Sequence, residues 1–220
     1  MGNNDYAIEQ KPLSELIAEQ LRARIWDKDM AFGERLLETD LAEEYDVSRS
    51  TIREALKILE AEELVVSQAR KGTYVADFTG EDFNEMIELR TLLETKAFKK
   101  ALPKLDKEHM AALEKIINEM KQKAAEKDWH ALFDLDTAFH SYIVHLCGNS
   151  RIVKIYQSLQ VQIRTFLMHL DKYYSSHQSF YEEHKDLYEA IATKDEKKVQ
   201  EKVRTHIEYV EEKLLDGNYN

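Results

Sequence analysis

The 220-residue chain contains 31 Lys and Arg against 42 Asp and Glu, which gives a formal net charge of -11 and argues against nonspecific coating of nucleic acid. With 43% hydrophobic residues, 33% charged residues, 2 Pro and 6 Gly, the composition predicts a folded, helix-rich protein of one or two domains. A lone cysteine, Cys147, excludes an intrachain disulfide, and no apolar run approaches the ~20 residues of a membrane span. The N-terminus MGNNDYAIEQ lacks the features of a secretory signal, so we expect a cytoplasmic protein with no membrane partner.

The first 77 residues contain three apolar stretches at helical spacing and then two stretches typical of β-strands. Pro12 suits the first turn of the first helix, and SQARKG suits the tip of a hairpin. In chain order the apolar positions are Leu13, Leu16, Ile17, Leu21 and Ile25; Leu36, Leu37, Leu41, Ala42 and Tyr45; Ile52, Ala55, Leu56 and Leu59; and Val65, Val66, Tyr74 and Val75. Three helices followed by a two-stranded wing is the order of a winged helix-turn-helix, which we predict for residues 1–77.

The segment DVS predicts a tight turn between the second and third helices. Asp46 can occupy the left-handed backbone region more easily than most residues, and Ser48 suits the N-cap of the next helix. The first turn of that helix, which in this fold enters a major groove, would then carry Arg49, Ser50, Thr51 and Arg53.

These residue types suit nucleic acid. Arginine can fork onto guanine or clamp a phosphate, and Ser and Thr hydroxyls reach phosphates or base edges. At the tip of the wing, Arg70 and Lys71 could reach neighbouring phosphates or the minor groove. The alternative is an ordinary amphipathic helix with a solvated charged face. Residues 1–76 hold more acids than bases, so recognition would have to depend on a concentrated basic face.

The stretch GERLLETDLAEEYDVSRSTIREALKILEAEELVVSQARKGTYV resembles the DNA-binding domain of the GntR family of bacterial transcription regulators. The shared pattern is G-x-x-L-x-E-x-x-L-A, then V-S-R-x-x-[VI]-R-E-A-L, a leucine-rich run and a glycine in the wing. The chain departs at Asp46, usually glycine, at Thr51, commonly proline, and at Thr39, where some relatives have a DNA-contacting arginine. By position, the resemblance implies DNA contacts from Ser48, Arg49, Ser50, Thr51, Arg53, Arg70, Lys71 and Gly72.

Residues 78–220 read as helix almost throughout. The first window opens after Thr79, a possible cap, and ends at Pro103; Gly148 and Ser150 mark a later stop and restart. The remaining windows are about 106–127, 129–147, 150–172, 174–193 and 195–215. Short connections between long helices predict an all-α, mostly antiparallel bundle of six or seven helices as the second domain.

Four residues of this second domain could form a metal site. Asp136 and His140 are four residues apart and share one helical face, while His184 and His206 each lie in an apolar stripe. Inward imidazoles and a carboxylate can converge on a borderline divalent metal in a bundle core. The alternative is that each is a hydrogen-bonded core residue. Surface or structural roles are expected for His109, His130, His145, His169 and His177.

Residues 79–215 resemble the all-helical effector-binding domain, called FCD, of the FadR subfamily of GntR regulators. Its metal-binding members share D-x-x-x-H, a later E-H-x-x-[IL] and a final H-[IV], which Asp136, His140, His184 and His206 match in order. The resemblance implies a divalent ion, Zn or Ni, with positions open to water or a carboxylate effector. Arg90 resembles an arginine that helps bind the carboxylate; a salt bridge to a nearby acid is the alternative.

Together these features predict a sequence-specific transcription regulator, most often a repressor in this family, and not an enzyme. A homodimer would bind a pseudo-palindromic operator, and a small carboxylate bound at or near the metal would control that binding. One alternative is a helical metal-dependent hydrolase with an appended helix-turn-helix, although no general base is placed by a recognisable motif. Another is that the metal serves only as a structural staple.

Overall fold

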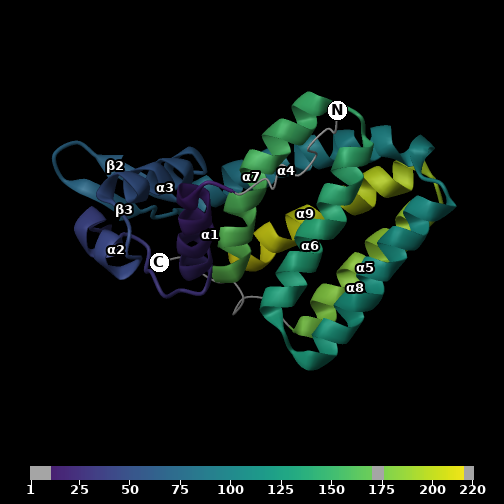
Figure 1. Ribbon diagram of the computed structural model, residues 1–220. Coiled ribbons are helices and arrows are strands. Elements are labelled where there is room, and N and C mark those ends of the chain that lie inside the picture. Colours follow the sequence, from purple (N-terminus) through teal and green to yellow (C-terminus); the bar gives the residue numbers. More distant parts are fainter. Residues whose placement is uncertain (1–10, 170–175, 216–220) are drawn as a thin grey trace, which may run out of the picture. The chain divides into compact units, whose positions relative to one another are not determined.

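Figure 1 shows a computed structural model of the chain, which describes residues 11–169 and 176–215. The chain divides into two compact units, Met1–Asp77 and Phe78–Asn220, and each has its own buried apolar core. The mainly α architecture predicted from the sequence is confirmed. Among the described helices, none combines the length and the apolar character that crossing a membrane requires.

The N-terminal unit has the predicted order of three helices and a wing. Its elements are α1 (Leu13–Trp26), β1 (Arg35–Leu36), α2 (Glu38–Glu44), α3 (Arg49–Ala61), β2 (Val65–Gln68) and β3 (Gly72–Val75). Both α1 and α2 pack against α3, and Leu21, Ile52 and Leu59 are fully buried at this junction. Burial of one apolar face of α3 leaves its opposite, charged face at the surface.

The wing contains a third strand that the sequence did not predict. β1 pairs antiparallel with β3, with Arg35 opposite Tyr74, so the strand order is β1-β3-β2. Assignment of Leu36 and Leu37 to the second helix was therefore wrong. Leu36 is buried within β1, whereas Leu37 is an exposed N-cap of α2. A two-residue strand is too short to show an alternating apolar pattern. It forms because β3, far along the chain, supplies its hydrogen-bonding partner.

The buried stripe of α1 is also displaced from the predicted one. Ile17, Leu21 and Ile25 are buried as predicted, but Leu13 and Leu16 are exposed. Pro12 is the N-cap and does not lie within the first turn. The small residues Ser14 and Ala18 occupy the buried positions at the start of α1.

The C-terminal unit is an all-α bundle. Its elements are α4 (Gly80–Ala101), the short 3-10 helix η1 (Leu102–Lys104), α5 (Lys107–Glu126), α6 (Trp129–Leu146), α7 (Ser150–His169), α8 (His177–Ala192) and α9 (Glu196–Leu215). α4 packs against α6, α7 and α9, and α5 packs against α6 and α8, which lies beside it in Figure 1. The predicted window ends at 170–172 and 174–175 fall outside the described residues.

Local signals fix where the helices of the bundle begin and end. Thr79 forms a capping box with Asp82 at the start of α4, which confirms the predicted cap. Gly148 has a φ of +70° between α6 and the start of α7 at Ser150. Within α6, the buried face that includes Phe133, Phe139 and His140 points into the bundle.

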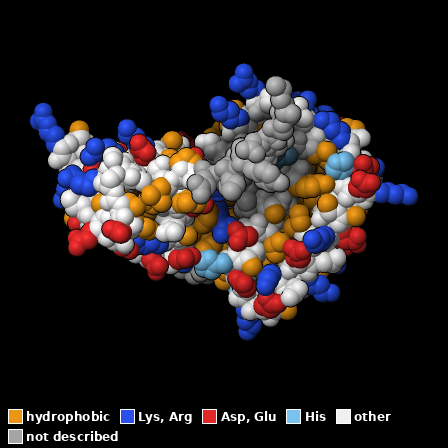
Figure 2. Space-filling model, in the orientation of Figure 1, with side chains coloured by type: hydrophobic (Ala, Val, Ile, Leu, Met, Phe, Trp, Pro, Cys, Tyr) orange, Lys and Arg blue, Asp and Glu red, His pale blue; other side chains and the backbone are white. Residues whose placement is uncertain are grey.

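Charges of both signs are interspersed over the face of the molecule drawn in Figure 2, where Lys and Arg side chains lie among Asp and Glu side chains. This mixture agrees with the acidic net charge of -11. Attraction of DNA by a broad positive field is therefore not expected, and recognition has to come from a local constellation of side chains.

Candidate functional site

The turn before α3 has the predicted geometry. Asp46 has a φ of +51°, in the left-handed region, and Ser48 is the N-cap of α3. The Ser48 hydroxyl accepts a hydrogen bond of 3.2 Å from the backbone N–H of Thr51 and lies 2.7 Å from the Ser50 hydroxyl. This cap fixes the start of α3 and leaves Ser48, Arg49 and Ser50 exposed.

Two arginines project from α3 and share one acid. The side chains of Arg49 and Arg53 are 61% and 54% exposed. Arg53 donates from Nε and Nη2 to the two oxygens of Glu38, at 3.0 and 2.6 Å, and Arg49 Nη2 lies 3.7 Å from the same carboxylate. The hydrogen bond from Arg53 lowers the pKa of Glu38. Glu38 therefore holds both guanidinium groups on one side of α3.

Arg70 and Lys71 of the wing lie between β2 and β3, and Gly72 is the first residue of β3. Arg70 and Lys71 are exposed, as a contact with nucleic acid would need. Gly72 has a φ of +112°, and a Cβ there would lie 3.2 Å from Arg35 Nε, so both the backbone and the neighbouring side chain favour glycine. Thr39 is exposed on α2, where its hydroxyl donates to Asp40.

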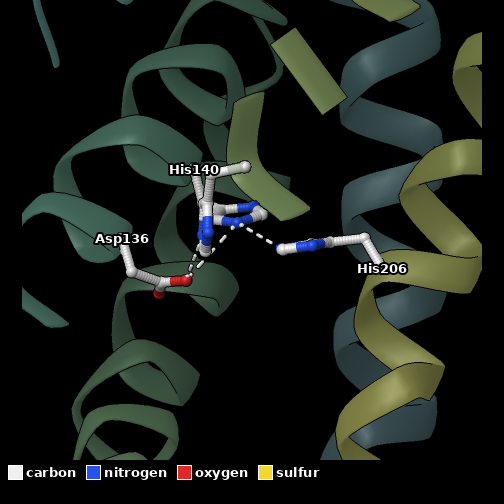
Figure 3. Close-up of side chains that lie close together, drawn as sticks. Asp136, His140 and His206 are labelled. Carbon is white, nitrogen blue, oxygen red and sulfur yellow. Dashed lines mark hydrogen bonds and ion pairs between the residues drawn. The ribbon is translucent and has the colours of Figure 1, made fainter. Parts of the chain in front are cut away.

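A second constellation lies inside the helical unit, where Asp136, His140, His184 and His206 come together. α6 supplies the first two, α8 supplies His184 and α9 supplies His206. All four are buried, and one ligand atom from each lies within 4.8 Å of all the others. Figure 3 shows Asp136 and His140 on one helix facing His206 on another.

The distances between donor atoms fit a bound metal ion. The Nε2 atoms of His140 and His206 are 3.2 Å apart, and Asp136 Oδ1 lies 2.8 Å from His184 Nε2 and 3.6 Å from His140 Nε2. Two nitrogens each about 2.0–2.1 Å from a tetrahedral zinc are separated by about 3.4 Å. Residue types, burial and spacing therefore agree with a site for a divalent ion.

Outer hydrogen bonds orient two of the three imidazoles, those of His140 and His184, toward the centre of the cluster. His184 Nδ1 donates to the carbonyl of Phe180 at 2.8 Å, and His140 Nδ1 donates to Glu94 Oε2 at 2.6 Å. With Nδ1 protonated, the lone pair is on Nε2 and faces the cluster. Burial and then the neighbouring His184 and His140 hold the pKa of His206 well below its usual value, which keeps that ring neutral.

Glu94 of α4 connects the cluster to two further buried groups. Its Oε1 accepts from Arg90 Nε at 2.8 Å and from the Tyr156 hydroxyl at 2.9 Å, while Arg90 Nη2 lies 3.8 Å from Asp136 Oδ1. Burial alone would raise the pKa of Glu94, but the neighbouring His140 and Arg90 outweigh it and hold that pKa at about 2. Arg90 thus forms the salt bridge considered above, and it also lies beside the cluster.

Glu38, Glu94 and Tyr156 were not predicted to take part in either site. The spacing of four between Arg90 and Glu94 was a usable signal, because such pairs meet on one helical face. No sequence signal joins Glu94 to Tyr156, 62 residues away, or Glu38 to Arg53, 15 residues away.

Replacing Glu94 by glutamine is expected to lower the affinity for a divalent ion by roughly 10- to 100-fold, the range for loss of an outer partner of a metal ligand. The neutral amide is a weaker acceptor for His140 Nδ1 and Arg90 Nε. Competition with a chromophoric chelator measures the affinity. Tyr156→Phe is the control, because it removes a donor to Oε1 and leaves His140 on Oε2. Equal losses in the two variants would contradict this account.

Comparison with known proteins finds one family match for each of the two units. Residues 13–75 match the model for bacterial regulatory proteins of the gntR family, and residues 85–209 match the FCD domain. The gluconate operon transcriptional repressor of Bacillus licheniformis is 31% identical over 205 residues, covering 91% of this chain and 84% of the relative. The chain belongs to the GntR family. The Bacillus subtilis gluconate operon transcriptional repressor is similar to this GntR-family chain to the same extent, 31% over 206 residues.

Solved structures agree with this GntR assignment. A structure from Rhodococcus sp. RHA1 described as a GntR regulator is 26% identical, with a TM-score of 0.78 over 94% of this chain and 99% of that one. E. coli McbR/YncC also has a TM-score of 0.78, covering 95% and 100%, and at 18% identity it shows the fold alone. These relatives are named regulators, which places this GntR protein among transcription regulators and not among enzymes.

Proposed function

We propose that the protein is a homodimeric repressor, acting in the cytoplasm, that binds a pseudo-palindromic operator. A small carboxylate bound at or near a divalent metal ion in the FCD domain controls this binding. The surface formed by Ser48, Arg49, Ser50, Thr51 and Arg53, with Arg70, Lys71 and Gly72 of the wing, reads the operator. Exposure of both arginines at the capped start of α3 supports this assignment, because that turn of the helix enters the groove in this fold.

The observation that carries the effector proposal is a hydrogen-bond donor of Arg90 that has no acceptor in the described part of the chain and lies beside the four candidate metal ligands. Arg90 is buried, and its Nη2 has no hydrogen-bond partner among the described residues, although it lies 3.8 Å from Asp136 Oδ1. Buried polar groups without partners are rare in folded proteins, and a guanidinium suits a carboxylate. An ion that takes five or six ligands would keep positions open beyond the four protein ligands.

The relatives support the same class of effector. Two of them are named as repressors of a gluconate operon, and gluconate is itself a small carboxylate. Zn or Ni suits the three imidazoles and one carboxylate, since both accept nitrogen ligands readily. The metal would supply an electrophilic anchor for the acid, and Arg90 would neutralise its charge.

The proposal is tested by the effect of organic acids on operator affinity. A DNA duplex is first selected from a random library with the metal-loaded protein, and its Kd is measured by fluorescence anisotropy. The carboxylic-acid fraction of a cell extract is expected to weaken binding about 5- to 150-fold, the usual range of allosteric coupling. The same extract depleted of acids by anion exchange is the control and is expected to leave the Kd unchanged.

Failure to select any sequence-specific duplex would overturn the DNA-binding part. A response to the acid-depleted fraction alone, or to neither fraction, would overturn the carboxylate part, because an effector must favour one conformation to shift the equilibrium.

A further inference from the structure

The outward face of α4 carries an unusual order of side chains. Leu89 and Leu92 are 50% and 62% exposed in the middle of the helix. In the described part of the helical unit, the other large hydrophobic side chain of this kind is Ile155, on the neighbouring helix α7. Leucines this exposed on a helix of a bundle indicate a surface that another protein covers.

The charged residues around these leucines have opposite signs at the two ends of α4. The exposed stripe reads, in order, Asp82, Glu85, Leu89, Leu92, Lys96 and Lys99. Its spacing alternates between three and four residues, which keeps the stripe on one face and is the spacing of a coiled-coil seam. The acids occupy the N-terminal half, the lysines occupy the C-terminal half and the leucines lie between them.

This order is complementary to itself when the helix is reversed. A two-fold axis midway between Leu89 and Leu92 sets each leucine against the other leucine of a second copy. The same axis sets Glu85 against Lys96 and Asp82 against Lys99. In a two-fold interface residue i meets residue j and j meets i, and the stripe satisfies this condition at every position.

The helix dipole does not account for the whole pattern. It favours acids in the first turn and bases in the last turn, which covers Asp82 and Lys99. These two also have partners within the chain, in Thr79 and Glu196. Glu85 and Lys96 lie beyond those turns, are exposed, and form no ion pair with any described residue. The dipole leaves them and the two leucines unexplained.

We propose that α4 pairs antiparallel with α4 of a second copy of this chain through the seam of Glu85, Leu89, Leu92 and Lys96. The proposal rests on the homodimer of the proposed function and assigns the surface that forms it. The leucines supply the apolar centre, and the two Glu85–Lys96 pairs fix the antiparallel orientation, because a parallel pair would set like charges against each other.

Sedimentation velocity over a concentration series tests the apolar centre. The unmodified protein is expected to be a reversible dimer, and Leu92→Glu is expected to weaken dimerisation on the order of 100-fold, since the two-fold axis doubles each change. Leu13→Glu is the matched control, because Leu13 is 53% exposed but lies on α1 in the other unit. Far-UV circular dichroism and metal content verify that each variant is folded.

A charge swap tests the orientation. Glu85→Lys and Lys96→Glu are each expected to weaken dimerisation roughly tenfold at low salt, and the double variant is expected to restore it, because it reverses every pair and keeps the composition. A Leu92→Glu variant that stays dimeric, or a double variant no better than the singles, would overturn this interface while leaving a dimeric regulator intact. A monomeric unmodified protein would overturn the dimer itself, and operator binding would remain a separate measurement.

Discussion

Replacing both Arg49 and Arg53 by alanine is expected to weaken binding of the selected operator roughly 100- to 10,000-fold, because each arginine contact to a base or phosphate is worth about 10- to 100-fold. The two guanidinium groups project from the capped start of α3 and are held together by Glu38. Fluorescence anisotropy at several salt concentrations measures the loss. The slope of log Kd against log salt should also fall, by about one unit for each phosphate contact removed.

The control removes the same charge elsewhere. Lys115→Ala with Lys121→Ala changes the net charge by the same amount from an exposed part of α5 and should leave the operator Kd nearly unchanged. If the two double variants weakened binding equally, recognition would depend on net charge and the surface on α3 would not be the reading surface. Circular dichroism excludes unfolding, which is not expected because both arginine side chains are more than half exposed.

Loss of one imidazole from the cluster is expected to lower the affinity for the divalent ion by roughly 100- to 1000-fold, if a total of about 10–16 kcal/mol is shared among four ligands. His184→Ala and His206→Ala test this, because the Nε2 atoms of both rings face the centre of the cluster. Elemental analysis of natively purified protein should find about one ion per unmodified chain and far less in either variant. Chelator competition gives the affinities.

His145→Ala is the matched control for these variants. His145 lies on α6 with two of the ligands, but it is exposed and its Nδ1 bonds to the Ser141 carbonyl. Equal metal content in all variants, or no uptake of metal by the unmodified protein, would refute the site. If metal-free protein unfolded at a lower temperature but, while folded, responded to acids as before, the ion would be a structural staple.

Features encoded by neighbouring residues were predictable from the sequence. The turn at Asp46, the cap at Ser48 and the cap at Thr79 each depend on a hydrogen bond or a dihedral angle within about four residues. The cluster was predicted by motif because each ligand lies at a buried position of its helix. Their convergence needs packing between helices, which periodicity does not encode.

Pairings between distant residues were missed for the same physical reason. β1 has two residues and exists only because β3 supplies a partner. The apolar pattern of α4 predicts a helix but gives no sign that Glu94 is buried. The hydrogen bonds to Glu94 from other helices come from His140 on α6 and Tyr156 on α7. A buried carboxylate is stable only with several donors around it, so its role becomes visible once those donors are in place.

α4 supplies none of the four candidate metal ligands, yet its Glu94 accepts a short hydrogen bond from His140 Nδ1, and its Arg90 lies 3.8 Å from Asp136. A movement of the His140 ring would either carry Glu94 with it or take one of its three hydrogen-bond donors from this buried carboxylate, which is costly. α4 is also the first helix after the boundary at Asp77 and the helix to which we assign the contact with a second copy. One helix of 22 residues therefore carries an outer partner of a candidate metal ligand, the first helical turn after the unit boundary in the sequence, and the surface proposed to contact a second copy.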